Sequence, residues 1–93
     1  MTSRLVRASG LAEVGEQGAC YVLNLPRIEE QQSPYVFEGP AFEIWSRIDG
    51  TRTEEQIVDE LVEATGAERQ VVARDTSDFL ATLRGLGLIE DVE

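Results

Sequence analysis

Carboxylates are the residues of this chain most able to do chemistry, because the other common catalytic groups are scarce. The sequence has 18 Asp and Glu residues, one cysteine and no histidine. Two nearby carboxylates can act as general acid and base in glycoside hydrolysis, and adjacent acidic pairs occur at Glu29-Glu30, Glu54-Glu55 and Asp59-Glu60. All three pairs fall in polar segments, where carboxylates stay solvated. We therefore interpret them as solubilising and helix-capping residues.

The absence of histidine removes the usual general base, together with the Ser-His-Asp and Cys-His nucleophile systems. Cys20 lies between Ala19 and Tyr21, with no arginine nearby in the sequence to stabilise a thiolate, so we expect an inert core residue. One cysteine without histidine also excludes the usual zinc ligand sets. No calcium loop or glycine-rich phosphate loop is present. The sequence therefore predicts a protein that is not an enzyme, with no catalytic residue, metal or cofactor.

The length and the net charge of the chain limit the kinds of molecule that it is expected to bind. The 93 residues fit one domain, placed at residues 1–93, of which 1–10 and 90–93 are expected to fray. All eight basic residues are arginines and the formal net charge is −10, which repels nucleic-acid phosphates and favours a basic partner. A lone cysteine suits a reducing cytosol, and no apolar run approaches the roughly 20 residues of a membrane span. We expect a cytoplasmic protein that binds neither nucleic acid nor membrane.

The elements that must position a binding site follow from hydrophobic spacing. Runs at 11–14, 20–25 and 34–38 are typical of strands, and the polar segment 27–33 is expected to form a loop. From residue 39 the apolar period becomes helical. The chain is therefore expected to belong to the α+β class, with a small three-stranded antiparallel sheet followed by three helices, like a winged helix-turn-helix.

Local signals mark the ends of the helices. Pro40 suits the first position of a helix. Thr53 and Gln56 have the spacing of a capping box at the start of the second helix, and Gly66 is expected to end it. The third helix covers roughly residues 71–85, and its apolar stripe faces the core.

A helix-turn-helix raises the alternative of DNA binding. A reading helix presents basic or amide side chains to bases and phosphates, whereas the last helix here has Asp75 and Asp78 beside Arg74. The preceding helix adds further carboxylates that would face the phosphate backbone. A winged-helix regulator, or another kind of protein-interaction module, therefore stays as the alternative reading.

An ordered set of motifs resembles the PqqD-like family and spans roughly residues 19–89. The motifs are Tyr21-Val-Leu-Asn-Leu-Pro26, Tyr35-Val-Phe-Glu38, Ala41-Phe-Glu-Ile-Trp45, Asp49-Gly-Thr-Arg-Thr53 and Phe79-Leu-Ala-Thr-Leu83 with Gly87-Leu-Ile89. No single motif is diagnostic, but their order is specific. The loop at 27–33 is longer than the tight turn of PqqD itself and is most similar to standalone members of lasso-peptide pathways.

This family comprises the recognition elements of ribosomally made, post-translationally modified peptides. The resemblance implies that the chain binds the leader segment of a precursor peptide. It further implies that the chain delivers this peptide to separate enzymes, a leader protease and a cyclase. The leader is expected to lie between the third strand and the last helix.

Strand chemistry supports this placement, since an unpaired sheet edge can accept an extended peptide as an additional strand. Pro34 should mark the end of the paired stretch, and the last helix should offer carboxylates to a basic or apolar leader. For Tyr35 and Phe37, the sequence does not decide between a position in the core and a position in the groove. Trp45 is assigned to the core. The expected leader-binding residues are Pro34, Tyr35, Val36, Phe37, Glu38, Val71, Arg74, Asp75, Asp78 and Phe79.

Overall fold

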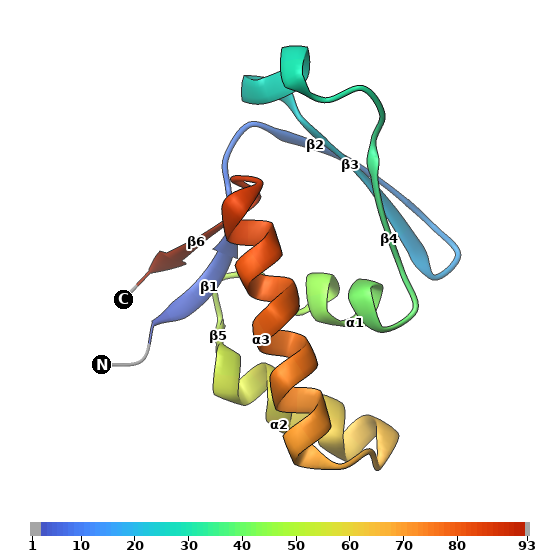
Figure 1. Ribbon diagram of the computed structural model, residues 1–93, viewed down its shortest axis with the longest axis vertical. Helices are drawn as coiled ribbons and strands as arrows, with labels where there is room; N and C mark the ends of the chain where they lie inside the picture. The colour runs from blue at the N-terminus through green and yellow to red at the C-terminus, as the bar shows by residue number, and fades with distance from the viewer. Residues whose placement is uncertain (1–2, 93) are drawn as a thin grey trace.

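Two small antiparallel sheets and three α-helices build the protein (Figure 1). The structure is a computed structural model and describes residues 3–92. The first sheet has the order β2-β3-β4, with β2 at Leu11–Glu16, β3 at Ala19–Asn24 and β4 at Tyr35–Glu38. This sheet confirms the three strands predicted from the sequence, and the mixed α+β class is confirmed with it.

Side chains of the first sheet alternate between a buried face and an exposed face. Cys20 pairs with Phe37, and both side chains are buried on the face that meets the helices. Tyr21 pairs with Val36 on the opposite, exposed face. Because successive residues of a strand point to opposite faces, Tyr35 shares the inner face with Phe37.

The second sheet is absent from the sequence prediction. It has the order β5-β1-β6, with β1 at Arg4–Arg7, β5 at Arg52–Thr53 and β6 at Ile89–Val92. The fraying expected at 1–10 and 90–93 is therefore wrong for the residues in these strands, while residues 1, 2 and 93 lie outside the described residues.

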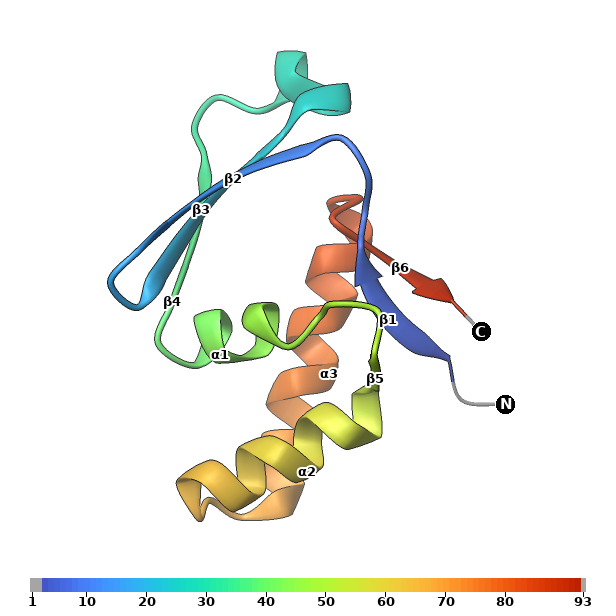
Figure 2. The ribbon, with the colours of Figure 1, turned by 180° about the vertical axis from the view of Figure 1, so that it is seen from behind.

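The physical reason for this second sheet is burial. Leu5 of β1 and Ile89 of β6 join the core, and the Gly50 amide donates to the Leu5 carbonyl oxygen at 2.7 Å. Both ends of the described chain are thus anchored by the same sheet. Figure 2 shows them side by side on the opposite side of the molecule from β4.

Three helices follow β4 as predicted: α1 at Pro40–Ser46, α2 at Glu54–Thr65 and α3 at Arg69–Gly85. The capping box of Thr53 and Gln56 is confirmed, and Gly66 ends α2 in the left-handed conformation. A short 3₁₀ helix, η1, at Leu25–Glu30 overlaps the start of the loop predicted at 27–33. No helix among residues 3–92 has the length and apolar character needed to cross a membrane.

One hydrophobic core joins both sheets to all three helices. Trp45 of α1 lies at its centre, which confirms its assignment to the core, and Cys20 is buried there as predicted. The other members are Leu5, Val22, Phe37, Ile44, Ile48, Ile57, Leu61, Leu80, Leu83, Leu88 and Ile89. Because residues distant in the sequence share this core, the position of β4 relative to α3 is fixed by packing.

A polar cluster connects the two sheets and α1 at the margin of this core. Glu13 Oε1 on β2 accepts hydrogen bonds from Arg7 Nη1 and Trp45 Nε1, each at 3.0 Å, and from Cys20 Sγ at 3.6 Å. The Arg7 guanidinium also donates to the Trp45 carbonyl oxygen at 2.8 Å and lies 4.8 Å from the centre of the Trp45 ring. Burial raises the pKa of the Cys20 thiol and the nearby Glu13 carboxylate raises it further, so the thiol stays protonated.

An ion pair attaches β6 to the end of α3. Asp91 accepts from Arg84 Nε at 3.1 Å and from Arg84 Nη2 at 3.0 Å, and Ser3 Oγ adds a third bond at 3.2 Å. The hydrogen bonds from Arg84 lower the pKa of Asp91. Because the carboxyl group has a lower pKa in the folded chain than in the unfolded chain, the pair stabilises the fold above about pH 4 and this stability is lost as the pH falls further.

The Asp91→Asn substitution should lower the free energy of unfolding at pH 7 by about 0.5 kcal/mol. The value is small because the side chains of Arg84 and Asp91 are 40% and 43% exposed, where solvent screens the attraction. Urea unfolding at a series of pH values would show the difference from the unmodified protein shrinking below about pH 4. Glu90→Gln on the same strand is the matched control and should show no such trend; a difference independent of pH would contradict the ion-pair assignment.

Candidate functional site

One edge of β4 has no strand neighbour among residues 3–92, because β4 is the last strand in the order β2-β3-β4. Its other edge pairs with β3 over all four residues, from Tyr35 opposite Val22 to Glu38 opposite Ala19. In an antiparallel pair, backbone groups point alternately toward the partner and away from it. Part of the N–H and C=O groups of β4 therefore point outward, where they can bond to an additional strand.

Helix α3 packs against the inner face of this strand, and the surface between the open edge of β4 and Val71, Asp75 and Phe79 of α3 is called the groove below. The Phe79 ring meets the Phe37 ring edge-on at 5.4 Å between centroids, and Phe37 also contacts Trp45 at 5.0 Å. Val71 and Asp75 precede Phe79 at intervals of four residues, so all three lie along one side of the helix. That side faces β4.

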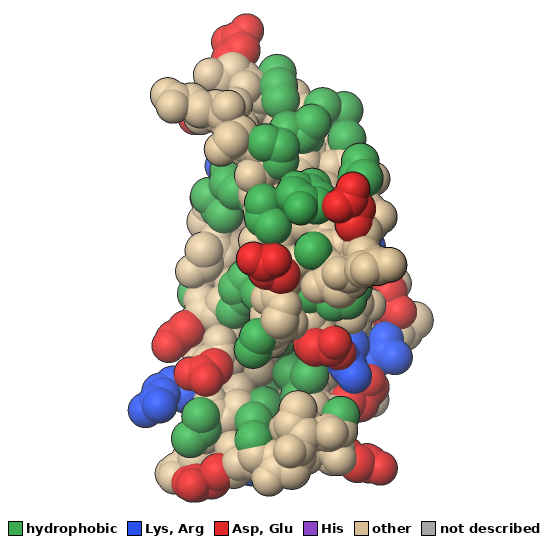
Figure 3. Space-filling model, turned by 90° about the vertical axis from the view of Figure 1, so that its right-hand side faces the viewer, with side chains coloured by type: hydrophobic (Ala, Val, Ile, Leu, Met, Phe, Trp, Pro, Cys, Tyr) green, Lys and Arg blue, Asp and Glu red, His purple; other side chains and the backbone are tan. Residues whose placement is uncertain are grey.

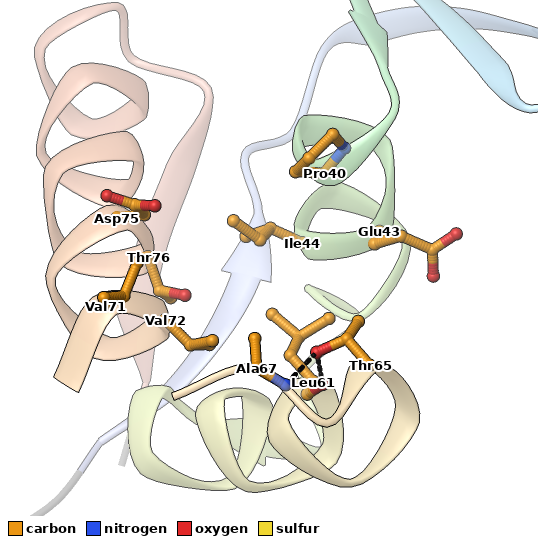
Figure 4. Close-up of a pocket in the computed structure, with 10 residues that line it drawn as sticks. All are labelled: Pro40, Glu43, Ile44, Leu61, Thr65, Ala67, Val71, Val72, Asp75 and Thr76. Carbon is orange, nitrogen blue, oxygen red and sulfur yellow. Dashed lines mark hydrogen bonds between the residues drawn. The ribbon is translucent and has the colours of Figure 1, made fainter. Parts of the chain in front are cut away.

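An apolar cavity of about 310 Å³ lies between the three helices and has Val71 and Asp75 on its wall. Figure 4 shows Ile44, Leu61 and Val72 pointing into it from α1, α2 and α3 in turn. The remaining lining residues are Pro40, Glu43, Thr65, Ala67, Val71, Asp75 and Thr76. A cavity with almost wholly apolar walls is suited to an aliphatic or aromatic side chain.

Thr76 provides a polar group on the wall of this cavity. The residue is only 1% exposed, and its Oγ1 atom makes no hydrogen bond within residues 3–92. The neighbouring Thr65 hydroxyl is already engaged, since it donates to the Leu61 carbonyl oxygen at 2.7 Å and accepts from the Ala67 amide at 3.2 Å. An unpaired buried hydroxyl carries an energetic cost of about 1–3 kcal/mol, which a polar atom of an occupant would relieve.

Negative charge borders the groove. Within residues 3–92, the carboxylates of Asp75 and Asp78 form no ion pair, whereas Glu43 is already paired with Arg47 at 2.9 Å. No group of three or more potential metal ligands occurs in the described part of the chain. The two unpaired carboxylates are therefore available to basic groups of a bound molecule.

The structure brings together most of the predicted site residues. Val71 and Asp75 line the cavity, and Phe79 is partly buried against the core. Asp78 is exposed one residue before Phe79 and is not among the residues that line the cavity. Pro34 directly precedes β4 and is exposed, so it fits the expected end of a paired stretch. The role of these residues in binding stays a prediction.

Four of the predicted residues do not lie on the groove wall. Phe37 is only 7% exposed, so the choice left open between core and groove is decided for the core, whereas Tyr35 is partly buried on the same face. Val36 and Glu38 point to the outer face of the sheet. Arg74 is on the side of α3 opposite the buried Leu83, about two and a half turns away, and it borders a separate surface hollow.

The cavity itself was missed by sequence reasoning. Ile44, Leu61, Val72 and Thr76 all belong to apolar helical stripes, which predict burial without saying where packing leaves a space. The one available signal is the hydroxyl of Thr76 within such a stripe. A polar residue on an apolar helix face indicates either a local helix bond or a binding role.

Comparison with known proteins decides the family. Residues 28–89, more than half of the chain, match the family model for coenzyme PQQ synthesis protein D (PqqD). The chain belongs to the PqqD family. This confirms the resemblance drawn from the ordered motifs, and it places β4, α1, α2 and α3 of the PqqD-family chain within the matched region.

A solved structure, "TbiB1 in Complex with the TbiA(beta) Leader Peptide", has the same fold. It superposes with a TM-score of 0.79 and 22% sequence identity, covering 91% of this chain and 94% of that one. No curated protein matches the chain. The coverage shows that the two structures share their fold over most of the chain.

The buried position of Phe37 leads to a prediction about the free energy of unfolding. Phe37→Ala should lower the free energy of unfolding by about 3–5 kcal/mol, because it leaves a cavity between Trp45 and Phe79. Val36→Thr, one residue away on the exposed face, is the matched control and should change it by less than about 0.5 kcal/mol. Urea unfolding followed by circular dichroism measures both; equal losses would contradict the inner orientation of Phe37.

Proposed function

We propose that this PqqD-family chain binds the leader segment of a ribosomally made precursor peptide as an additional strand along β4. The observation that carries the proposal is the open edge of β4 beside α3 and its cavity. The similar TbiB1 structure is described as a complex with a leader peptide, which supports the same class of ligand here. The chain then delivers the peptide to separate enzymes, a leader protease and a cyclase of a lasso-type pathway.

The two sheets differ in how their terminal strands are protected. Edge strand β6 has acidic side chains at Glu90 and Asp91, and charges of this kind discourage further strand pairing. Edge strand β4 has the sequence Tyr-Val-Phe-Glu, in which only Glu38 is charged. The contrast favours β4 as the edge that accepts a peptide.

Backbone bonds to β4 would supply affinity, and side-chain pockets would supply selectivity. Inward-pointing side chains of the leader would meet Tyr35 and Phe79, and one apolar side chain would enter the cavity above Val72. Basic groups of the leader would pair with Asp75 and Asp78. We therefore expect a leader that combines apolar and basic residues.

The proposed role is accessory and not catalytic. The only thiol, that of Cys20, is buried and its pKa is raised by burial and by Glu13, so it is unsuited to nucleophilic attack. The carboxylates of Asp75 and Asp78 are exposed, and the Glu43 carboxylate at the cavity is paired with Arg47 at 2.9 Å. We propose that the chain acts in the cytoplasm without a cofactor, and that chemistry on the peptide belongs to its partner enzymes.

Strand addition predicts slower hydrogen exchange along one edge only. Adding the synthetic leader of the neighbouring precursor gene should protect the amides of 35–38 that point away from β3, because each gains a carbonyl partner. The amides of 89–92, on the other edge strand β6, are the internal control and should be unchanged. Binding without new protection in β4 would show that the leader uses another surface.

The carboxylate of Asp75 on α3 is predicted to make a salt-dependent contribution to leader binding. Asp75→Asn should weaken leader binding about three- to tenfold at low salt and reduce the dependence of affinity on ionic strength, since one attractive carboxylate is lost. Glu63→Gln removes the same charge from α2 away from the cavity and serves as the matched control. Isothermal titration at several salt concentrations tests this; identical salt slopes for both variants would exclude Asp75 from the site.

A further inference from the structure

The segment between β3 and β4 has little apolar burial to hold it in place. None of the six residues of η1 is buried, and Leu25 and Ile28 are 50% and 45% exposed. Figure 3 shows hydrophobic side chains at the surface over the upper part of the side on which β4 lies. Because burial of apolar groups is the main force that orders a chain, the position of this segment depends on polar side chains instead.

The side-chain amide of Gln31 takes the place of a strand at the end of β3. Its Oε1 atom accepts a hydrogen bond from the Asn24 amide at 2.8 Å, and its Nε2 atom donates to the Val22 carbonyl oxygen at 3.0 Å. The ladder between β3 and β4 ends at the pair of Val22 and Tyr35. Nε2 also donates to the Ser33 carbonyl oxygen at 3.0 Å, so one side chain connects the end of β3 to the chain just before β4.

Asn24 extends this connection to the end of α3. Its Nδ2 atom donates to the carbonyl oxygen of Leu86, the residue directly after α3, at 3.0 Å, and Asn24 is only 4% exposed. Arg27 of η1 adds a longer bond of 3.5 Å to the Gly85 carbonyl oxygen. The last carbonyl groups of a helix have no partner within the helix, so these donors satisfy them. A continuous series of hydrogen bonds therefore joins Ser33 to the end of α3.

We propose that Gln31 is a positioning residue for leader binding, which keeps the start of β4 in place before the leader arrives. The inference rests on the proposed function, because β4 and α3 border the groove. Phe37 is held in the core by its contacts with Trp45 and Phe79, whereas Tyr35 at the start of β4 is only partly buried. The Gln31 network, meaning the hydrogen bonds of Gln31 to Asn24, Val22 and Ser33, supports the end of the strand that the core supports least.

A strand edge that is already formed favours association with a peptide. A leader strand can add only where the backbone groups of β4 are aligned, and the apparent affinity falls in proportion to the fraction of molecules that are competent to bind. Substitution of residues that touch a ligand acts mainly on the dissociation rate. Loss of a positioning residue instead lowers the association rate, so kinetics can separate the two roles.

Gln31→Ala tests the network in the free protein, with Gln32→Ala as the matched control. The Gln32 side chain is exposed and makes no hydrogen bond within residues 3–92. Hydrogen exchange of the Asn24 amide, followed by NMR without any peptide, should be about tenfold faster in Gln31→Ala, because this amide loses its acceptor. The exchange rate should be unchanged in Gln32→Ala. Equal rates in the two variants would overturn the network.

Stopped-flow fluorescence with a labelled synthetic leader tests the effect on binding. The association rate constant should fall about fivefold or more in Gln31→Ala while the dissociation rate constant stays the same. Gln32→Ala should match the unmodified chain in both constants. A change confined to dissociation would make Gln31 a contact residue and overturn the positioning role, as would equal rate constants in the two variants.

Gln31→Met provides a second variant, because methionine keeps the length and nearly the volume of glutamine and removes all three hydrogen bonds. It should fold, as checked by circular dichroism, and should associate as slowly as Gln31→Ala. Association as fast as in the unmodified chain would overturn the hydrogen-bond basis of the proposal. Failure of the unmodified chain to bind the leader would overturn the proposed function and the positioning role together, while the exchange difference at Asn24 would still establish the network.

Discussion

The carboxylate of Glu13 is the contact on which the arrangement of the two sheets depends. One oxygen accepts from Arg7 of β1, Trp45 of α1 and Cys20 of β3, and therefore joins β1 and α1 to the β2-β3-β4 sheet. Trp45 in turn supports Phe37 on β4. Removing such a shared acceptor would leave partly buried donors unpaired, which costs more than the bonds themselves contribute. The inner face of the sheet is thereby fixed, while the edge of β4 stays open.

Much of the fold could be predicted because its signals are local. Alternation predicts β2, β3 and β4, and the Thr53–Gln56 capping box predicts the start of α2. The second sheet could not be predicted, since β1 pairs with β6 from the other end of the chain. In β1 only Leu5 is fully buried, and a single apolar side chain gives no periodic pattern. Pairing between such distant segments depends on the assembled core.

The candidate site likewise has features that local sequence signals predict and features that they do not. Strand order predicts the edge at Tyr35–Glu38, and β4 is an edge strand. Helical spacing predicts a place for Asp75 beside the apolar stripe, and Asp75 lines the cavity; the role of both in binding stays a prediction. The cavity between the helices could not be inferred, because Ile44, Leu61 and Val72 read as ordinary core positions. Whether three apolar stripes close completely or leave a space depends on the distances between helix axes, which sequence periodicity does not specify.

The adjacent positions of β1 and β6 have a consequence for how the domain can be carried by other proteins. Arg4 lies opposite Val92, and both are on the side of the molecule remote from β4 (Figures 1 and 2). A polypeptide fused at either position would extend away from the groove and leave it accessible. The same geometry makes the fold suited to insertion into a host loop, because its entry and exit points are neighbouring residues of one ladder.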